Sequence, residues 1–197
     1  LRHWLVNRTH KYGNDDDDAD GLMVRVFNAL FEELDGRPNS KGGRYRVEML
    51  PTTCHVYFGS VTGAMPDGRK AEEALADGSL SPMRGLDRRG PTAVLKSALA
   101  ADFRESAISI LNLRFPRTLA QSPESMEKLA ALTETFMRSG GSHIQYNLLD
   151  HRVLLEAKKN PEKFKDLVVR VAGYSAYFIH LTPEVQDDII RRTEPGI

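Results

Sequence analysis

One glycine interrupts an otherwise apolar segment near the end of the chain. The residues before Gly173, from Leu167 to Ala172, are mostly β-branched and apolar, and this composition predicts a buried strand. A glycine at the end of a strand indicates a tight turn or a close approach of the backbone to another group. From this segment alone, a turn is the simpler interpretation, so any chemistry at Gly173 has to be argued from the rest of the chain.

The single cysteine, Cys54, precedes His55 and raises the possibility of an activated thiol nucleophile. Because the surrounding residues predict a strand, the two adjacent side chains are expected to point to opposite faces. We therefore predict that Cys54 is a buried and inert thiol. One cysteine also excludes an internal disulfide framework and a cysteine-rich zinc or iron–sulfur site, and it is typical of a reducing, cytoplasmic environment.

Three other groups could do chemistry, and each has a simpler structural interpretation. The run Asp15–Asp18 could bind calcium, but the EF-hand spacing is missing and a capped helix start is favoured. His143 could act as a base, although it has no carboxylate partner nearby in sequence and fits the start of a strand. Arg69 and Lys70 could bind an anion, but the surrounding turn residues favour a scaffolding loop. No metal site is predicted in this chain.

The elements that must position these residues alternate between helices and strands, which predicts an α/β fold. A long turn-rich loop is expected at 59–90, and Ser122 and Thr182 are expected to cap helices whose first residue is proline. The expected helices are 19–34, 91–99, 123–137, 151–158 and a last one from 183. Their predicted apolar faces consist of Leu22, Val26, Ala29, Leu30 and Leu34 in the first helix, of Leu129, Leu132, Phe136 and Met137 in 123–137, and of Val185, Ile189 and Ile190 in the last. The expected strands are 44–58 (interrupted near Pro51), 107–115, 143–150 and 167–172.

Composition limits the class of protein. The 197 residues are enough for a single domain with a real core. Lys plus Arg and Asp plus Glu number 27 each, so no basic excess would attract nucleic acid or an anionic membrane. No apolar run is long enough to span a bilayer, and no signal peptide is expected. Because the first residue is Leu1, we expect a piece of a longer protein.

Four separated strings closely resemble the signatures of glycyl radical enzymes, in that family's order. They are Lys11–Asp15, Gly63–Lys70, Gly140–Asn147 and Arg170–Tyr174, the last followed by Leu181–Ile190 and Arg192–Glu194. The resemblance implies that Gly173 carries an organic radical, within a motif formed by Arg170, Val171, Ala172 and Tyr174. The radical would be installed by an S-adenosylmethionine iron–sulfur activase, with no other cofactor bound, and relayed to a cysteine.

Glycine is required for this role because an α-carbon radical is planar and conjugated with the amides on both sides. A side chain would clash with that planar arrangement and would replace the hydrogen that the resting radical keeps. The site is also expected to exclude water and oxygen, as a loop surrounded by apolar strands would do.

The resemblance also implies the architecture of the whole enzyme. The chain would be a single domain, 1–197, forming the C-terminal part of an α/β barrel with surrounding helices, and 166–194 would be the radical loop and last helix. The family's thiyl cysteine lies in an upstream loop that is missing here, so this chain alone should be inactive. Expected partners are the activase, the missing N-terminal barrel portion, a small-molecule substrate and, in the full-length protein, a second copy.

The subtype is narrowed by the residue before the glycine. Pyruvate formate-lyases typically have serine where this chain has Ala172, so an anaerobic lyase of the dehydratase type is favoured. An arylacetate decarboxylase, an arylsuccinate synthase and a stand-alone radical subunit that docks on a larger chain are the alternatives. The candidates for the substrate pocket are Thr52, Thr53 and Arg192. A structural alternative exists for each: Thr52 and Thr53 could be strand residues beside a proline bulge, and Arg192 could be an arginine that the helix dipole favours near a helix C-terminus. His143, Gln145 and Asn147 are expected to line the barrel or to pack within it.

Overall fold

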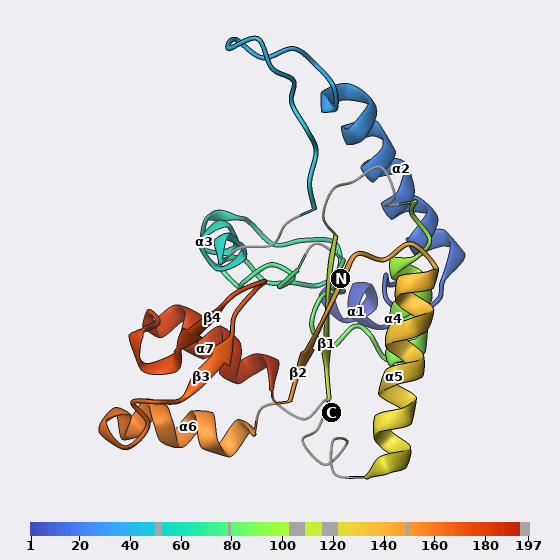
Figure 1. Cartoon of the computed structure of the whole chain (residues 1–197). Coiled ribbons are helices and arrows are strands. Elements are labelled where there is room, and N and C mark those ends of the chain that lie inside the picture. Colours follow the sequence, from blue (N-terminus) through green and yellow to red (C-terminus); the bar gives the residue numbers. More distant parts are fainter. Residues whose placement is uncertain (50–52, 79, 103–108, 116–121, 149, 194–197) are drawn as a thin grey trace.

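A parallel pair of strands lies at the centre of the fold. The computed structural model describes residues 1–49, 53–78, 80–102, 109–115, 122–148 and 150–193. Its elements, shown in Figure 1, are α1 Arg2–Arg8, α2 Asp17–Leu34, α3 Cys54–Val61, α4 Pro91–Ala98, β1 Ile110–Arg114, α5 Pro123–Arg138, β2 His143–Asn147, α6 His151–Lys159, the 3₁₀ helix η2 Pro161–Lys163, β3 Val168–Arg170, β4 Ser175–Tyr177, the 3₁₀ helix η3 Phe178–His180 and α7 Pro183–Arg192.

Strands β1 and β2 are joined through α5 in a β–α–β unit. They pair in parallel, with Ile110 opposite His143 and Arg114 opposite Asn147. Helix α5 begins as predicted, because Ser122 accepts a bond from the Ser125 backbone N–H at 3.2 Å and Pro123 occupies the first helical position. The predicted helices at 91–99 and 123–137 and the strands at 107–115 and 143–150 are therefore present within a few residues of their expected bounds.

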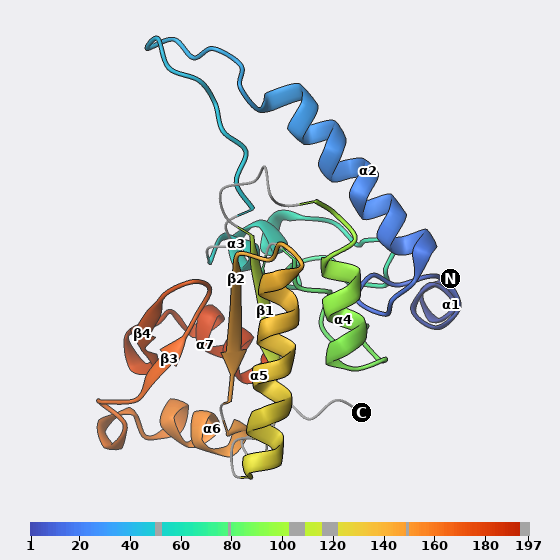
Figure 2. The same cartoon turned by 45° about the vertical axis from the view of Figure 1, so that its right-hand side comes forward.

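The two faces of this strand pair differ in polarity. Leu111 and Leu113 point to one face and join a core that includes Val94 of α4 and Phe136 of α5. Figures 1 and 2 show α4 and α5 on that side of the strands. Side chains alternate between the two faces of a strand, and residues directly opposite each other in a parallel pair lie on the same face. The face opposite to Leu111 and Leu113 is therefore formed by two opposed pairs, Asn112 with Gln145 and Arg114 with Asn147, and it is polar. We call Asn112, Arg114, Gln145 and Asn147 the polar face.

A second core surrounds the hairpin formed by β3 and β4. The hairpin is antiparallel, and Arg170 pairs with Ser175 at the end next to the turn. Its buried residues pack with α6, η3 and α7 in one cluster consisting of Leu154, Ala157, Val169, Val171, Phe178, Val185, Ile189 and Ile190. The predicted apolar face of the last helix is thereby confirmed. Figure 1 shows this unit across the strand pair from α4 and α5, so the hairpin lies beside β1 and β2.

The predicted loop at 59–90 is correct only from Thr62 onward, because residues 59–61 belong to α3, and the loop is tied by the Arg69 side chain. Arg69 is buried, and its guanidinium donates to the carbonyl oxygens of Thr62 at 3.1 Å and Gly63 at 2.6 Å, and also to that of Glu73. The Arg69 backbone N–H donates to the Asp67 carboxylate at 2.9 Å. These bonds confirm the scaffolding interpretation of the loop, because the guanidinium is occupied by backbone oxygens.

Helix α2 is amphipathic as predicted, but its apolar face is exposed. Phe27 is buried in the first core and anchors the helix, while the predicted apolar residues Leu22, Val26, Leu30 and Leu34 remain about half exposed. Both views show α2 and the segment after it projecting away from the strand pair. Within the described residues, this apolar stripe has no covering element.

The segment 44–58 departs from the predicted strand, because residues from Cys54 onward form helix α3. Tertiary contacts explain the difference: His55 is buried against Asp188, and a Cβ on Gly59 would lie only 2.4 Å from the Glu73 carbonyl oxygen. A helix brings both residues to the packed side, and this packing outweighs the β-propensity of the aromatic and β-branched residues. The predicted burial of Cys54 is also wrong, since its side chain is exposed.

Three smaller predictions are corrected. Met137 was expected in the buried stripe of α5 but is largely exposed near the C-terminal end of the helix. Val168 was expected in a buried strand, yet it is 50% exposed because only the Val169 side of β3 faces the second core. Thr182 occupies the N-cap position of α7 as predicted, but its side chain makes no capping bond.

Candidate radical site

Gly173 lies in the turn that joins β3 to β4. The turn, residues 171–174, is closed by a bond of 2.8 Å from the Val171 N–H to the Tyr174 carbonyl oxygen. Gly173 has a φ of +76°, in the left-handed region that glycine enters without steric cost. The predicted turn is confirmed, and the left-handed conformation there favours a glycine on conformational grounds alone.

The turn is packed against strand β1. Val171 and Ala172 are buried, Gly173 is partly buried and Tyr174 is 41% exposed. A Cβ added to Gly173 would lie 3.3 Å from the Cδ1 atom of Ile110, which is tighter than most contacts of that kind. The α-carbon of Gly173 is thus held beside the first residue of β1 and is partly shielded from solvent.

Two side chains hold the polar groups of Gly173. The Gly173 N–H donates to Oε1 of Gln145 at 3.2 Å. The Gly173 carbonyl oxygen accepts a bond of 3.1 Å from the Arg170 guanidinium. Arg170 also donates through Nε to the same Gln145 oxygen at 3.0 Å, so strand β2 and the β3–β4 turn are joined through one amide side chain.

A buried arginine on α7 holds the other side of the turn. Arg192 is 6% exposed, and its Nη1 donates to the Val171 carbonyl oxygen at 2.7 Å. Its Nε donates to the Asp188 carboxylate at 2.7 Å, one helical turn earlier. Nη1 also lies 3.4 Å from Oδ2 of Asp77, which is itself buried. Arg192 therefore connects the last helix, the radical-loop motif and the 59–90 loop.

His55 and Arg114 complete this buried network. Nε2 of His55 lies 2.9 Å from the Asp188 carboxylate and 2.9 Å from Nη2 of Arg192, so its tautomer decides which of the two it bonds. Arg114 of β1 pairs with the other Asp77 oxygen at 3.0 Å. Two arginines thus face two carboxylates, and the network links α3, β1 and α7.

The charges and hydrogen bonds of this network lower the pKa of the Asp188 carboxyl. Burial by itself raises the pKa of the Asp188 carboxyl, but the hydrogen bond from His55 and the charge of Arg192 outweigh it and lower the pKa to about 2. Because the pKa is lower in the folded protein than the ordinary value of 3.8, the folded state favours the ionised carboxylate. The stabilisation is complete above about pH 4 and is lost as the pH falls from 4 to 2.

We expect acid to destabilise the wild-type protein through Asp188. A shift of this size corresponds to on the order of 2 kcal/mol of unfolding free energy, lost between pH 4 and pH 2. Urea denaturation at a series of pH values measures it. Asp188→Asn should lose this share of the acid sensitivity, whereas Asp187→Asn, at the half-exposed neighbouring position, should retain it. An unchanged pH dependence in Asp188→Asn would contradict the assignment.

The polar face of the strand pair carries side-chain atoms without partners among the described residues. They are Asn112 Oδ1, Arg114 Nε, Gln145 Nε2 and Asn147 Nδ2, and all are buried. Buried polar atoms are nearly always hydrogen-bonded in complete proteins. Since these atoms belong to the strands that also hold the Gly173 turn, they mark this face as the place where further polar groups would bind.

The predicted pocket residues are distributed around this network. Thr52 lies outside the described residues. Thr53 is partly buried at the N-cap position of α3, next to the helix that carries His55. Arg192 lines a small pocket together with Asp77 and Arg114, among other residues. The role of Thr52, Thr53 and Arg192 in substrate binding stays a prediction.

Sequence reasoning missed most of the network that holds the turn. The spacing of Asp188 and Arg192, four residues apart on a predicted helix, was a usable signal for an ion pair. Gln145 was expected to line the barrel or to pack, but its bond to Gly173 was not foreseen. His55 joins Asp188 across 133 residues, and no local pattern signals a contact of that range.

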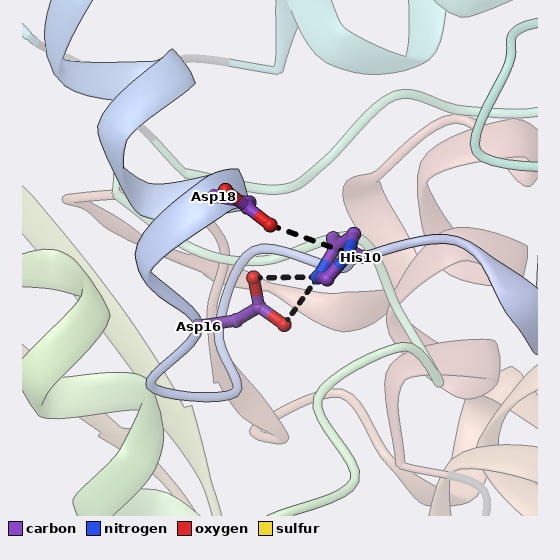
Figure 3. A group of neighbouring side chains, drawn as sticks. All are labelled: His10, Asp16 and Asp18. Carbon is purple, nitrogen blue, oxygen red and sulfur yellow. Dashed lines mark hydrogen bonds and ion pairs between the residues drawn. The ribbon is translucent and has the colours of Figure 1, made fainter.

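The acidic run forms the start of α2 rather than an EF-hand. Asp16 caps the helix by accepting a bond of 3.2 Å from the Ala19 N–H, as predicted. Figure 3 shows His10 between two of these carboxylates, with its ring nitrogens 2.8 Å from Asp16 and 3.4 Å from Asp18. Within the described residues, this is the one group of side chains with the spacing of a metal site. The hydrogen bond that the His10 ring donates to the Asp16 carboxylate raises the pKa of His10, which favours the protonated ring beside these exposed carboxylates.

No helix in the described part of the chain has the length and apolar character needed to cross a membrane. The prediction of a cytoplasmic location stays a prediction.

Two family models match the chain. Residues 76–179, about half of the chain, match the model described as "Glycine radical". Residues 1–59 match the model described as "Pyruvate formate lyase-like". The first match includes β1, β2 and the Gly173 turn, and the second includes α2 and most of α3.

Curated relatives resemble nearly the whole chain. Trans-4-hydroxy-L-proline dehydratase of Clostridioides difficile is 49% identical over 190 residues, which are 96% of this chain and 24% of the relative. Isethionate sulfite-lyase of Nitratidesulfovibrio vulgaris is 41% identical, over 96% of this chain and 23% of the relative. The chain therefore spans about a quarter of the length of these relatives.

A solved structure extends the likeness to the fold. The hydroxyproline dehydratase of Clostridioides difficile, with trans-4-hydroxy-L-proline bound, matches 100% of this chain and 25% of that protein, with a TM-score of 0.93 and 47% identity. Such a likeness over the entire chain confirms the prediction that it forms the C-terminal part of a larger α/β barrel.

Proposed function

Because the chain belongs to the glycyl radical enzyme family, we propose that Gly173 stores an organic radical and passes it to a cysteine outside this chain. One observation carries the proposal: Gly173 lies in a tight turn at φ +76°, held against the central strands with both of its polar groups bonded. The motif residues Arg170, Val171, Ala172 and Tyr174 serve to place that one α-carbon.

The radical is made and used by the transfer of single hydrogen atoms. The activase removes one of the two hydrogens on the Gly173 α-carbon as a hydrogen atom. That C–H bond breaks, and a new C–H bond forms on the carbon-centred radical that the activase makes from S-adenosylmethionine. The cysteine thiol later returns a hydrogen atom to Gly173, which re-forms the C–H bond and leaves a thiyl radical. Atoms and electrons balance, because each step exchanges one hydrogen atom for one unpaired electron. Partial burial of the turn limits the access of water and oxygen to the stored radical.

For the whole enzyme we propose an anaerobic radical lyase of the dehydratase type, cleaving a C–O or C–N bond. The relatives named above include a dehydratase that acts on a hydroxylated amino acid and a sulfite-lyase. The unpaired atoms of Asn112, Gln145 and Asn147 fit a small substrate with hydroxyl or amino groups, since each of them needs a polar partner. Thr52, Thr53 and Arg192 are proposed to line the same pocket.

The remaining barrel portion is the principal proposed partner, and it carries the cysteine loop. The chain spans only about a quarter of its relatives. Leu22, Val26 and Leu30 of α2, and Tyr57 and Val61 of α3, expose large apolar surfaces. Apolar surface of this extent is typical of a face that another part of a protein covers. The activase and, for the full-length protein, a second copy are the other proposed partners.

Anaerobic activation tests the radical role directly. The protein that carries this chain, treated with a radical S-adenosylmethionine activase, should give a doublet in the electron paramagnetic resonance spectrum. Growth on glycine deuterated at its α-carbon should collapse that doublet to a singlet. Air should then cleave the chain at Gly173, as followed by intact mass. A protein that is fully exposed to an activase known to be competent, yet gives no doublet and no cleavage, would contradict the proposal.

A decarboxylase acting on arylacetates is the second candidate, and one comparison favours it. Indoleacetate decarboxylase of Tractidigestivibacter scatoligenes is 36% identical over 93% of this chain. Incubation of the activated enzyme with hydroxylated amino acids, diols and arylacetates separates the two. Loss of water or ammonia supports the dehydratase type, and release of carbon dioxide from an arylacetate supports the decarboxylase.

A further inference from the structure

We propose that Arg170 and Gln145 form an amide clamp that tunes the stability of the radical on Gly173. This proposal rests on the radical role proposed above, and it assigns to the two side chains an electronic effect in addition to holding the turn. Neither side chain gains or loses a proton in it.

The clamp consists of a closed set of three hydrogen bonds. Gly173 donates its N–H to Gln145 Oε1 at 3.2 Å, and Arg170 donates to the same oxygen at 3.0 Å. The Arg170 guanidinium then donates to the Gly173 carbonyl oxygen at 3.1 Å. Both neighbours of the Gln145 side chain can only donate, so the atom between them must be its oxygen. One neutral acceptor and one cation therefore hold the two ends of a single residue.

The two ends of Gly173 have opposite roles in an α-carbon radical. The lone pair of the amide nitrogen donates electron density to the radical centre, and the carbonyl group withdraws it. A hydrogen bond from the N–H to Gln145 makes the nitrogen a better donor. A cation on the carbonyl oxygen makes that group a better acceptor. Both bonds therefore act in the direction that spreads the unpaired electron and stabilises the radical relative to the C–H form.

The surroundings strengthen both effects. Gln145 is 5% exposed, Ala172 and Ile110 beside the turn are buried, and Gly173 and Arg170 are partly buried. Electrostatic effects of hydrogen bonds are larger in such a partly desolvated environment than in bulk water. Within the described residues, the Arg170 guanidinium bonds only to Gln145, Ser175 and Gly173, and no carboxylate lies at ion-pair distance. Its charge is therefore not neutralised locally and acts on the Gly173 carbonyl.

The test compares the radical spectra of variants in the protein that carries this chain, activated anaerobically. Arg170→Met removes the cation and Gln145→Leu removes the acceptor, each with little change of volume. Less delocalisation leaves more spin on the α-carbon, so the doublet splitting should widen in both variants. The number of spins per protein should fall about tenfold, the change that loss of one charged hydrogen bond corresponds to. Arg170→Lys, which keeps the charge, should recover part of both effects.

Ser175→Ala is the matched control. Ser175 also accepts a bond from Arg170, at 3.2 Å, but among the described residues its side chain makes no hydrogen bond with the backbone of Gly173. Its removal should leave both the splitting and the spin count at the wild-type values. A purely structural role of Arg170 would change the spin count without changing the splitting, and this outcome counts against the clamp.

The outcomes separate the clamp from the radical role itself. A wild-type protein without a doublet overturns the radical role. A wild-type doublet, together with folded Arg170→Met and Gln145→Leu variants that have the same splitting, overturns the clamp alone. If those variants do not fold, the clamp is tested instead in the wild-type protein, labelled with ¹⁵N in its arginine guanidinium groups. Electron–nuclear double resonance should then detect coupling between the radical and an arginine nitrogen, and no coupling overturns the clamp.

Discussion

Gly173→Ala should abolish the radical completely while leaving the protein folded. An alanine at this position offers a single hydrogen on its α-carbon, and its methyl group would clash with the flanking carbonyl in the planar radical. The resting chain pays a smaller penalty: the left-handed conformation at φ +76° costs roughly 1–3 kcal/mol for a residue with a side chain. The added Cβ would also press on Ile110 at 3.3 Å.

The measurement is the spin count per protein after activation, followed by the intact mass after exposure to air. We expect no doublet and no cleaved fragment from Gly173→Ala. Gly63→Ala is the control, because a Cβ at Gly63 meets nothing within 4 Å and no left-handed conformation is required there. Its spin count should equal that of the wild type. A doublet of normal intensity from Gly173→Ala would show that the radical lies on another residue.

Arg192→Met should be the most destabilising single change in the network behind the turn. It leaves the buried carboxylates of Asp188 and Asp77 without their shared cation, and it removes the 2.7 Å bond to the Val171 carbonyl oxygen. Removal of one partner from a buried ion pair typically costs about 3–5 kcal/mol, because an uncompensated charge stays buried. Methionine fills a similar volume, so the loss is expected to be electrostatic.

Urea denaturation followed by circular dichroism measures the change in unfolding free energy. Arg191→Met on the same helix is the matched control, since the Arg191 side chain is only partly buried and, among the described residues, donates to one backbone oxygen, that of Asp187. Its effect should stay within about 0.5 kcal/mol. Equal effects of the two substitutions would mean that the buried network contributes no more than a surface arginine.

These predictions connect the last helix with the chemistry proposed for Gly173. Arg192 holds the turn on one side through Val171, and Gln145 holds it on the other through Gly173. Both anchors are buried side chains on regular elements, and this arrangement fixes a functional atom more precisely than a free loop would. The turn is therefore rigidly placed on its protein side, while Tyr174 remains exposed on the other.

Much of the local structure could be predicted from the sequence. Periodicity and capping residues located α4, α5, β1, β2 and α7, because each depends on interactions a few residues apart. The turn at Gly173 was predictable for the same reason. The segment after Thr53 was not, since its β-branched and aromatic residues fit a strand until His55 and Gly59 meet distant partners.

The sequence by itself determined the family and the α/β class, and it singled out Gly173 as the proposed radical carrier, because short motifs and local periodicity carry this information. Only the tertiary structure decided what holds that glycine. Gln145 reaches Gly173 across 28 residues, and Arg192 joins His55 across 137. Contacts of this kind depend on the way packed elements meet in space, and hydrophobic burial sets that arrangement without leaving a pattern in neighbouring residues.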